Sequence, residues 1–334
     1  MSSTSHTQAA HPWHDAALNS ILRALESGRL PHALLVHGLA GLDKRGLAEQ
    51  IAALVVCRKQ TVCGDCAPCK WFKAGNHPDV YRVGPLEDKT TIAVDQIRAL
   101  SAAMALASHS GDRKVALIRP ADRMTEAAAN ALLKTLEEPS GDSTLILVAD
   151  RLSALPITIV SRCQSLRVDC PSTEDALAWL ATYDAGADWP ALLRLTHGAP
   201  VAAHDLASDA FSQHLQGLSD DLRMLEKGQA DAGTVAARWA KLDAGRCLGW
   251  LEQRIGDLIR VRSGTAGRDV AHNLKPADLP VGIEEFNVIR LFRYWDAIGA
   301  ARRRLDTSLN VQQVLEAVLV PWTSGLIDRA TTHG

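Results

Sequence analysis

The sequence lacks long apolar runs, a surplus of either charge and an abundance of aromatic side chains. No stretch of about 18 uncharged apolar residues occurs, so we expect no membrane span and no membrane partner. Residues 1–14 are polar, so we expect no secretory signal and a cytoplasmic location. The 36 basic and 38 acidic residues leave a net charge of −2, which argues against a protein that holds DNA by its overall charge. Aromatic residues are only 4%, too few for a platform that stacks single-stranded bases.

Apolar bulk is what the sequence has. Its residues are 47% hydrophobic, which is enough for a packed core. Its length of 334 residues is too great for a single core of ordinary size. Up to about residue 168, short apolar runs alternate with helical patterns. The predicted strands are 33–37, 79–83, 114–118, 144–149 and 164–168. This alternation predicts an α/β domain with a mostly parallel sheet that helices cover on both faces.

Helical patterns follow the predicted strands and then dominate the chain. In the first part they cover residues 47–56, 94–107 and 129–136, with Thr125 as the predicted N-cap of the last and Pro139 as its stop. After Pro171 only helical patterns remain, at 174–181, 189–196, 201–207, 211–226, 234–242, 248–262, 284–305 and 311–321. Residues 264–279, rich in glycine, proline and charge, predict a loop.

Four cysteines lie close together in the sequence: Cys57, Cys63, Cys66 and Cys69. The last three form two overlapping C-x-x-C pairs, and Gly64 and Pro68 supply turn residues between them. Thiolates at this spacing can converge on one tetrahedral metal ion, so the pattern favours a structural zinc site. A redox C-x-x-C pair and unmetallated thiols are the alternatives. We interpret the scattered Cys163, Cys170 and Cys247 as small buried residues.

A damaged phosphate-binding loop follows the first predicted strand. Residues 38–45 read Gly-Leu-Ala-Gly-Leu-Asp-Lys-Arg, against the pattern G-x-x-x-x-G-K-[ST]. Gly38 and Lys44 fit this pattern, and Gly41 adds a further glycine to the turn. Asp43 stands in place of the second glycine, where we expect its charge to point at phosphates, and Arg45 replaces the hydroxyl that holds Mg²⁺. An ordinary strand–turn–helix without bound ATP is the favoured interpretation.

The acidic residues of an ATPase are also missing. The strand at 114–118 is followed by Arg119 and Pro120, where an ATPase carries carboxylates for Mg²⁺ and for the attacking water. Neither residue can perform that chemistry. The sequence therefore predicts no intrinsic ATP hydrolysis.

Three stretches carry a family resemblance. Asp-Arg-Met-Thr at 122–125, Ala-Asn-Ala-Leu-Leu-Lys-Thr-Leu-Glu-Glu-Pro at 129–139 and Ser-Arg-Cys-Gln at 161–164 resemble the AAA+ clamp-loader family. The similarity extends over roughly residues 13–210, and His-Pro-Asp at 77–79 is similar to the delta-prime subunits in particular. Catalytic gamma/tau subunits have an intact phosphate loop and a sensing arginine in the lid, where this sequence has Val201.

The resemblance implies a fold and a function. It implies an AAA+ (P-loop NTPase-like) domain over residues 1–168 with a zinc-binding insertion at 57–69, a helical lid over 169–208 and a helical collar over 209–334. It implies that Arg162 is an arginine finger offered to the ATP of a neighbouring subunit. The expected partners are the gamma/tau and delta subunits and, indirectly, the sliding clamp and primed DNA.

The expected setting is DNA replication, in a hetero-oligomer that belongs to a DNA-directed DNA polymerase, a nucleotidyltransferase. Two alternatives stay open. One is an ATP-hydrolysing subunit of the gamma/tau type, and the other is a zinc-dependent DNA-binding regulator.

Overall fold

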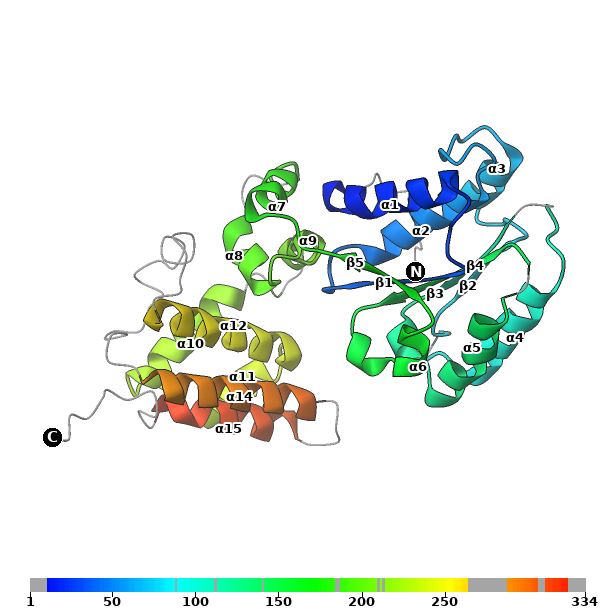
Figure 1. Cartoon of the computed structure of the whole chain (residues 1–334). Coiled ribbons are helices and arrows are strands. Elements are labelled where there is room, and N and C mark those ends of the chain that lie inside the picture. Colours follow the sequence, from blue (N-terminus) through cyan, green and yellow to red (C-terminus); the bar gives the residue numbers. More distant parts are fainter. Residues whose placement is uncertain are drawn as a thin grey trace. The chain divides into compact units, whose positions relative to one another are not determined.

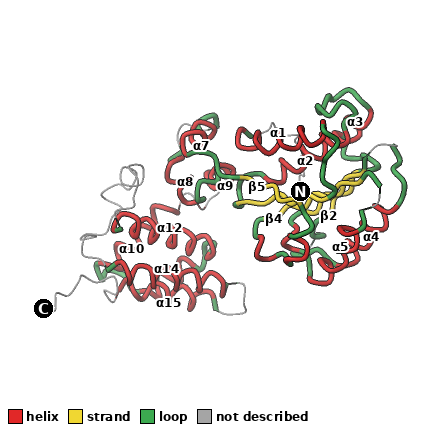
Figure 2. The backbone as a smooth tube through the Cα atoms, viewed as in Figure 1, coloured by secondary structure: helices red, strands yellow, loops and turns green. Residues whose placement is uncertain are grey.

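Five parallel strands form the sheet at the centre of the N-terminal part of the chain. The computed structural model describes residues 11–87, 89–110, 113–139, 141–183, 187–208, 211, 214–263, 287–305 and 310–323. The strands are β1 (Ala33–Gly38), β2 (Val80–Val83), β3 (Lys114–Ile118), β4 (Ser143–Ala149) and β5 (Gln164–Val168). Their order is β2-β3-β4-β1-β5, and every neighbouring pair is parallel. Figure 2 shows the strands gathered in one layer between helices. The predicted parallel α/β sheet is thereby confirmed.

Helices cover both faces of this sheet. They are α1 (Asp15–Glu26), α2 (Lys44–Val56), α3 (Ala67–Lys73), α4 (Val94–Ala105), α5 (Glu126–Glu137) and α6 (Ile157–Val160). Short 3₁₀ turns lie at η1 (Pro12–His14), η2 (Ala121–Arg123) and η3 (Leu152–Ala154). Figure 1 shows α1, α2 and α3 on one side of the sheet and α4, α5 and α6 on the other.

Strand β1 shows why helices must pack on both faces of the sheet. Ala33 and Leu35 belong to one buried cluster with side chains of α4, α5 and α6. Leu34 and Val36 are equally buried, and because side chains alternate along a strand they face the opposite side. A run of consecutive apolar residues is therefore the pattern of a strand covered on both faces.

The predicted boundaries of α5 are also found. The Thr125 hydroxyl accepts a hydrogen bond from the backbone N–H of Ala128, and the helix ends at Glu137, shortly before Pro139. Three helices, α1, α3 and the four-residue α6, were absent from the sequence prediction. Helix α3 is only seven residues long and carries too few apolar residues for a periodic signal.

The described residues of the C-terminal part form helices joined by turns and contain no strand, as predicted. Its helices are α7 (Thr173–Leu180), α8 (Trp189–Leu195), α9 (Pro200–Ser208), α10 (Leu215–Glu226), α11 (Ala232–Trp239), α12 (Ala244–Arg262), α14 (Val288–Arg304) and α15 (Val311–Thr323). Trp239 is fully buried, and its indole N–H donates to Asp221 Oδ2 at 2.9 Å. The loop predicted at 264–279 lies outside the described residues.

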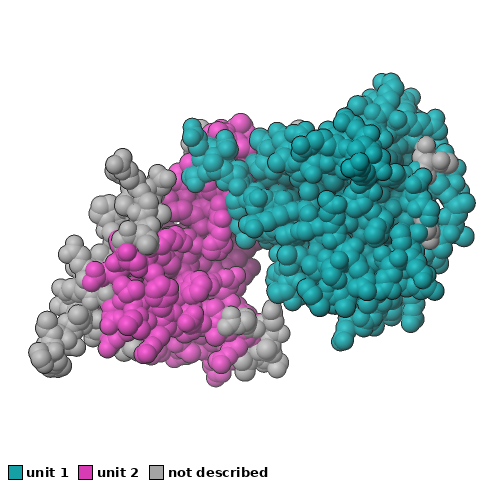
Figure 3. Space-filling model, in the orientation of Figure 1, with its two compact units in different colours: residues 1–176 teal, residues 177–334 magenta. Residues whose placement is uncertain are grey.

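The chain divides into two compact units, residues 1–176 and 177–334 (Figure 3). The finer division predicted from the resemblance, with boundaries at 168 and 208, stays a prediction. Among the helices of the described ranges, none has the length and apolar character needed to cross a membrane.

Candidate functional site

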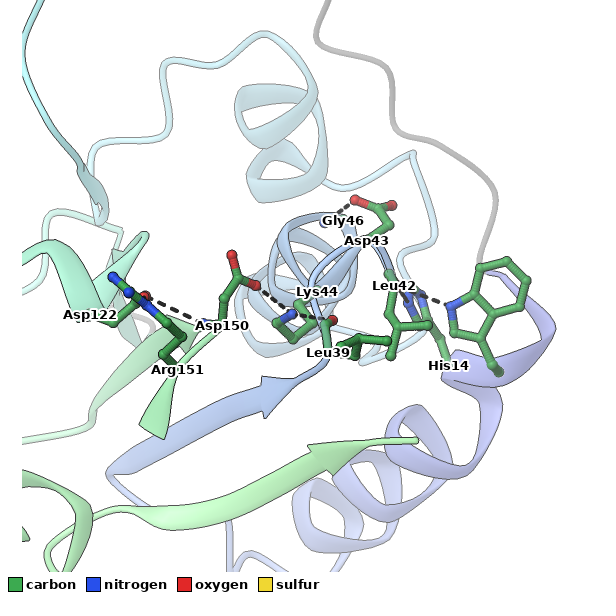
Figure 4. Close-up of polar contacts among 10 residues, drawn as sticks. His14, Leu39, Leu42, Asp43, Lys44, Gly46, Asp122, Asp150 and Arg151 are labelled. Carbon is green, nitrogen blue, oxygen red and sulfur yellow. Dashed lines mark hydrogen bonds and ion pairs between the residues drawn. The ribbon is translucent and has the colours of Figure 1, made fainter. Parts of the chain in front are cut away.

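Lys44 is the first residue of α2, after the loop that follows β1, where a phosphate loop would present it to a nucleotide. Its side chain is only 3% exposed, and its Nζ lies 2.5 Å from Asp150 Oδ1 (Figure 4). The same Nζ donates to the Leu39 carbonyl oxygen at 2.6 Å. Asp150 directly follows β4, and β4 pairs with β1, so the carboxyl ends of these two strands bring the pair together. The ammonium is therefore neutralised within the chain.

Asp43 occupies the N-terminus of α2 rather than open space. Its backbone is left-handed, with φ of 51°, and its Oδ1 accepts from the Gly46 backbone N–H at 2.9 Å. Oδ2 lies 3.3 Å from His11 Nε2. Burial by itself would raise the pKa of Asp43, but the hydrogen bonds from His11 and Gly46 outweigh it and hold the pKa below its ordinary value. A helix N-terminus can bind a phosphate, but here the Asp43 carboxylate occupies that position.

The Asp43 carboxylate fits there because Gly46 has no Cβ. A Cβ at position 46 would lie 2.0 Å from Asp43 Oδ2, closer than any real contact. We expected Asp43 to point toward a bound phosphate, and the structure instead turns it back over the first turn of its own helix.

Gly38 and Gly41 have conformational reasons of their own. Gly38 has φ of +147°, and a Cβ there would lie 2.4 Å from the Val168 carbonyl oxygen on β5. Gly41 has φ of +82°, a region that glycine enters at no steric cost. Both glycines are required by the path of the chain, whether or not a phosphate binds.

The turn η1 packs on this loop through Leu42. The Trp13 indole N–H donates to the Leu42 carbonyl at 3.0 Å, and His14 Nε2 lies 2.8 Å from the same oxygen (Figure 4). His14 is fully buried, and burial lowers its pKa. Sequence reasoning missed this contact, because nothing local to residues 12–14 signals a partner about 30 residues away.

Arg119, at the place of an ATPase carboxylate, is used in an ion pair. It bonds Glu49 of α2, and Arg82 Nη2 lies 2.9 Å from the other oxygen of Glu49. Burial would raise the pKa of Glu49, but these two guanidinium groups hold it low. Further along, Asp122 accepts from the Asp150 backbone N–H at 3.3 Å and lies 3.7 Å from Arg151 Nε. Glu49 and Asp122 therefore both have their partners within the chain.

The four neighbouring cysteines converge in space. Cys57 ends α2, Cys63 lies in the following loop, Cys66 precedes α3 and Cys69 lies within it. Their Sγ atoms all lie within 4.8 Å of one another, and the Cys57–Cys63 distance is 3.7 Å. A tetrahedron with metal–sulfur bonds of about 2.3 Å has edges of about 3.8 Å. The cluster could therefore hold a metal ion.

The thiols of this cluster differ in how readily they ionise. Burial opposes ionisation of Cys57, but backbone N–H groups of the loop outweigh it and lower the pKa to about 6. Burial and the neighbouring sulfurs raise the pKa of Cys69 to about 12. Four adjacent thiolates repel one another, so a cation is needed before all can ionise. Of the three other cysteines, Cys247 is buried and Cys163 half-buried, whereas Cys170 is exposed, which corrects its predicted burial.

Arg162 lies on the surface just after α6. Its side chain is 36% exposed, its Nη1 donates to the Thr158 carbonyl at 3.0 Å and its Nη2 lies 2.6 Å from Glu137 Oε1. These polar contacts lie within α5 and α6, so Arg162 is not part of the network around Lys44. A partly exposed guanidinium with a defined orientation can meet a phosphate brought by another molecule.

Comparisons with known proteins agree over both units. The family model described as DNA polymerase III, delta subunit, matches residues 13–171, and the one described as DNA polymerase III, delta subunit, C terminal, matches residues 210–324. DNA polymerase III subunit delta' of Pseudomonas aeruginosa is 32% identical over 333 residues, which cover 94% of this chain and 97% of that protein. The subunit of the same name from Yersinia pestis is 31% identical, covering 76% of this chain and 77% of that protein. That from Escherichia coli is 33% identical, covering 58% of this chain and 59% of that protein.

Proposed function

Because the chain belongs to the delta-prime family of DNA polymerase III subunits, we propose that it presents Arg162 to the ATP of a neighbouring clamp-loader subunit and hydrolyses no ATP itself. Its role in DNA replication as a clamp-loader subunit follows from that family. In this role it helps to place the sliding clamp on primed DNA, with gamma/tau and delta subunits as its partners.

The pairing of Lys44 with Asp150 carries the non-hydrolysing part of the proposal. A working phosphate loop offers its lysine and the helix N-terminus to the phosphates. Here Lys44 is buried against Asp150, and Asp43 covers the N-terminus of α2. A nucleotide would have to displace one carboxylate and approach another, and Arg45 supplies no hydroxyl for Mg²⁺.

Arg162 supports the second part of the proposal. An arginine finger stabilises the charge that develops on the transferred phosphoryl group, and its own subunit needs no nucleotide for this. The guanidinium lies at the surface on a short turn held by buried Ile159. Its planar fork suits a phosphate better than an ammonium would.

Zinc is the metal that we propose for the four cysteines. Four thiolates in a closed tetrahedron are typical of structural zinc. Such an ion would tie the end of α2 to α3. We further propose that the N-terminal unit is of the AAA+ type and that the helical part comprises a lid and a ring-forming collar.

Reconstitution with purified gamma/tau and delta subunits tests the proposal. We expect the wild-type chain, Arg162→Ala and Arg162→Lys to enter the complex equally. Hydrolysis at the adjacent site should fall by on the order of 100-fold or more in both variants, since lysine lacks the planar fork. Arg167→Ala, which removes an exposed arginine of β5, is the matched control and should hydrolyse as wild type. Unchanged hydrolysis by Arg162→Ala would contradict the role of Arg162.

Nucleotide binding to the isolated chain separates the alternatives. The proposal expects no saturable ATP binding, whereas a gamma/tau-type ATPase would bind ATP through Lys44. The regulator alternative expects DNA binding by the isolated chain that weakens as salt rises.

A further inference from the structure

The carboxylate that faces Arg162 belongs to Glu137, the last residue of α5. Glu137 Oε1 lies 2.6 Å from Arg162 Nη2, and the Glu137 side chain is 50% exposed. The second contact of the guanidinium is to the Thr158 carbonyl, one turn earlier. The orientation of Arg162 is thus set from two directions, by the backbone of α6 and by the end of α5.

The backbones on both sides of this pair are anchored. Leu136, next to Glu137, and Ile159, three residues before Arg162, are both buried in the core that α4, α5 and α6 form against the sheet. Helices α5 and α6 pack directly on each other. One packed core therefore holds the backbones that carry these two side chains beside each other.

Helix stability does not explain a carboxylate at this position. The C-terminus of a helix carries partial negative charge, so a glutamate in its last turn is unfavourable there. Glu138 follows directly and adds a second carboxylate. An ion pair between two side chains that are this exposed contributes little to folding stability. The contact instead restricts the conformations of Arg162.

We propose that Glu137 is a positioning residue for Arg162: it holds the guanidinium in the orientation that meets the phosphate of the neighbouring subunit. This inference rests on the proposed function of Arg162. A guanidinium has five N–H donors, and Thr158 and Glu137 use only part of them. The remaining donors stay available for phosphate oxygens. Ordering the long side chain in advance reduces the entropy that is lost when it engages.

Glu137→Gln in the reconstituted loader tests this inference. The variant keeps the length of the side chain and removes its charge. We expect kcat for ATP hydrolysis to fall about tenfold, with KM for ATP, complex formation and thermal unfolding of the chain unchanged. Glu138→Gln removes the neighbouring charge from the same helix end and is the matched control, with wild-type kcat expected.

A double-mutant cycle separates this inference from the proposed function. In an Arg162→Ala background, Glu137→Gln should have no further effect, because both changes act through one guanidinium. Wild-type or increased kcat for Glu137→Gln, together with a large loss for Arg162→Ala, would overturn the positioning role and leave the function of Arg162 standing. No loss for Arg162→Ala would instead overturn the proposed function. A tenfold loss that persists in the Arg162→Ala background would show a purely structural effect and also overturn the inference.

Discussion

Lys44 and Asp150 form an ion pair of 2.5 Å in which the Lys44 side chain is 3% exposed and the Asp150 side chain 48% exposed. The lysine that a nucleotide-binding loop would offer to phosphate already has its anion, supplied by the end of the neighbouring strand. The loop therefore departs from the phosphate-binding pattern in sequence, and its lysine is also paired with a carboxylate of the same chain.

Asp150→Asn should destabilise the region around Lys44, because a buried ammonium loses its partner. We expect a loss of about 2 kcal/mol, below the value for a fully buried pair since Asp150 is half-exposed. In a Lys44→Met background the same change should cost less than about 0.5 kcal/mol. Amide hydrogen exchange of α2 and β4 in increasing urea measures both values. Asp142→Asn, at an 86% exposed carboxylate, is the control, and equal losses in both Lys44 backgrounds would contradict the pairing.

Gly46→Ala should depend on Asp43. Alanine favours a helix by about 1 kcal/mol over glycine, but its Cβ would displace the Asp43 carboxylate from its cap, which costs about 1 kcal/mol. In the wild-type chain we therefore expect almost no change in the free energy of unfolding. In an Asp43→Ala background, Gly46→Ala should stabilise by about 1 kcal/mol. Equal effects in the two backgrounds, measured by urea unfolding, would refute this account of the glycine.

His14 should make the N-terminal unit sensitive to acid. Burial lowers the pKa of His14, and its Nδ1 has no hydrogen-bond partner in the described part of the chain. Below about pH 6.5 the unfolded chain binds a proton that the folded chain resists, so stability falls as the pH falls. The slope contributed by this group is at most about 1.4 kcal/mol per pH unit.

His14→Gln should flatten that slope, since glutamine can still donate to the Leu42 carbonyl and does not titrate. Urea unfolding between pH 7.5 and 5.5 measures the difference between the two chains. His109→Gln, at an exposed histidine, should leave the slope unchanged. A slope that His14→Gln does not alter would assign the acid sensitivity to other groups.

The four-cysteine cluster should bind zinc in an equimolar ratio. Chelation, or Cys66→Ser, should lower the free energy of unfolding of the N-terminal unit by more than about 2 kcal/mol, because metal binding is coupled to folding. Zinc affinity should fall with falling pH, since the ligands are thiolates and protons compete for them. Elemental analysis and thermal unfolding measure these effects. Cys170→Ser, outside the cluster, should retain the metal, and a zinc-free wild-type protein that unfolds at the same temperature would contradict the assignment.

Much of the fold could be predicted from local pattern. The strand predicted at 114–118 is β3, because a buried apolar run of this length suits a covered sheet. The possible fifth strand at 164–168 is β5, a mostly exposed strand at the edge of the sheet. Helix α1 was missed although Ala17, Ile21 and Leu25 recur every four residues and are buried. The side-chain direction of Asp43 could not be predicted, since it depends on the left-handed backbone and on the space above Gly46.

The sequence by itself determined the α/β class, the altered phosphate loop and the four converging cysteines, because each depends on residues close together in the chain. Only the tertiary structure decided the partners of the charged groups. Asp150 reaches Lys44 because β4 lies beside β1, and Glu137 reaches Arg162 because α5 and α6 share one core. Such pairs are set by strand order and helix packing, which bring together residues that are distant in the chain. The sequence around each residue of a pair does not show which partner it will meet.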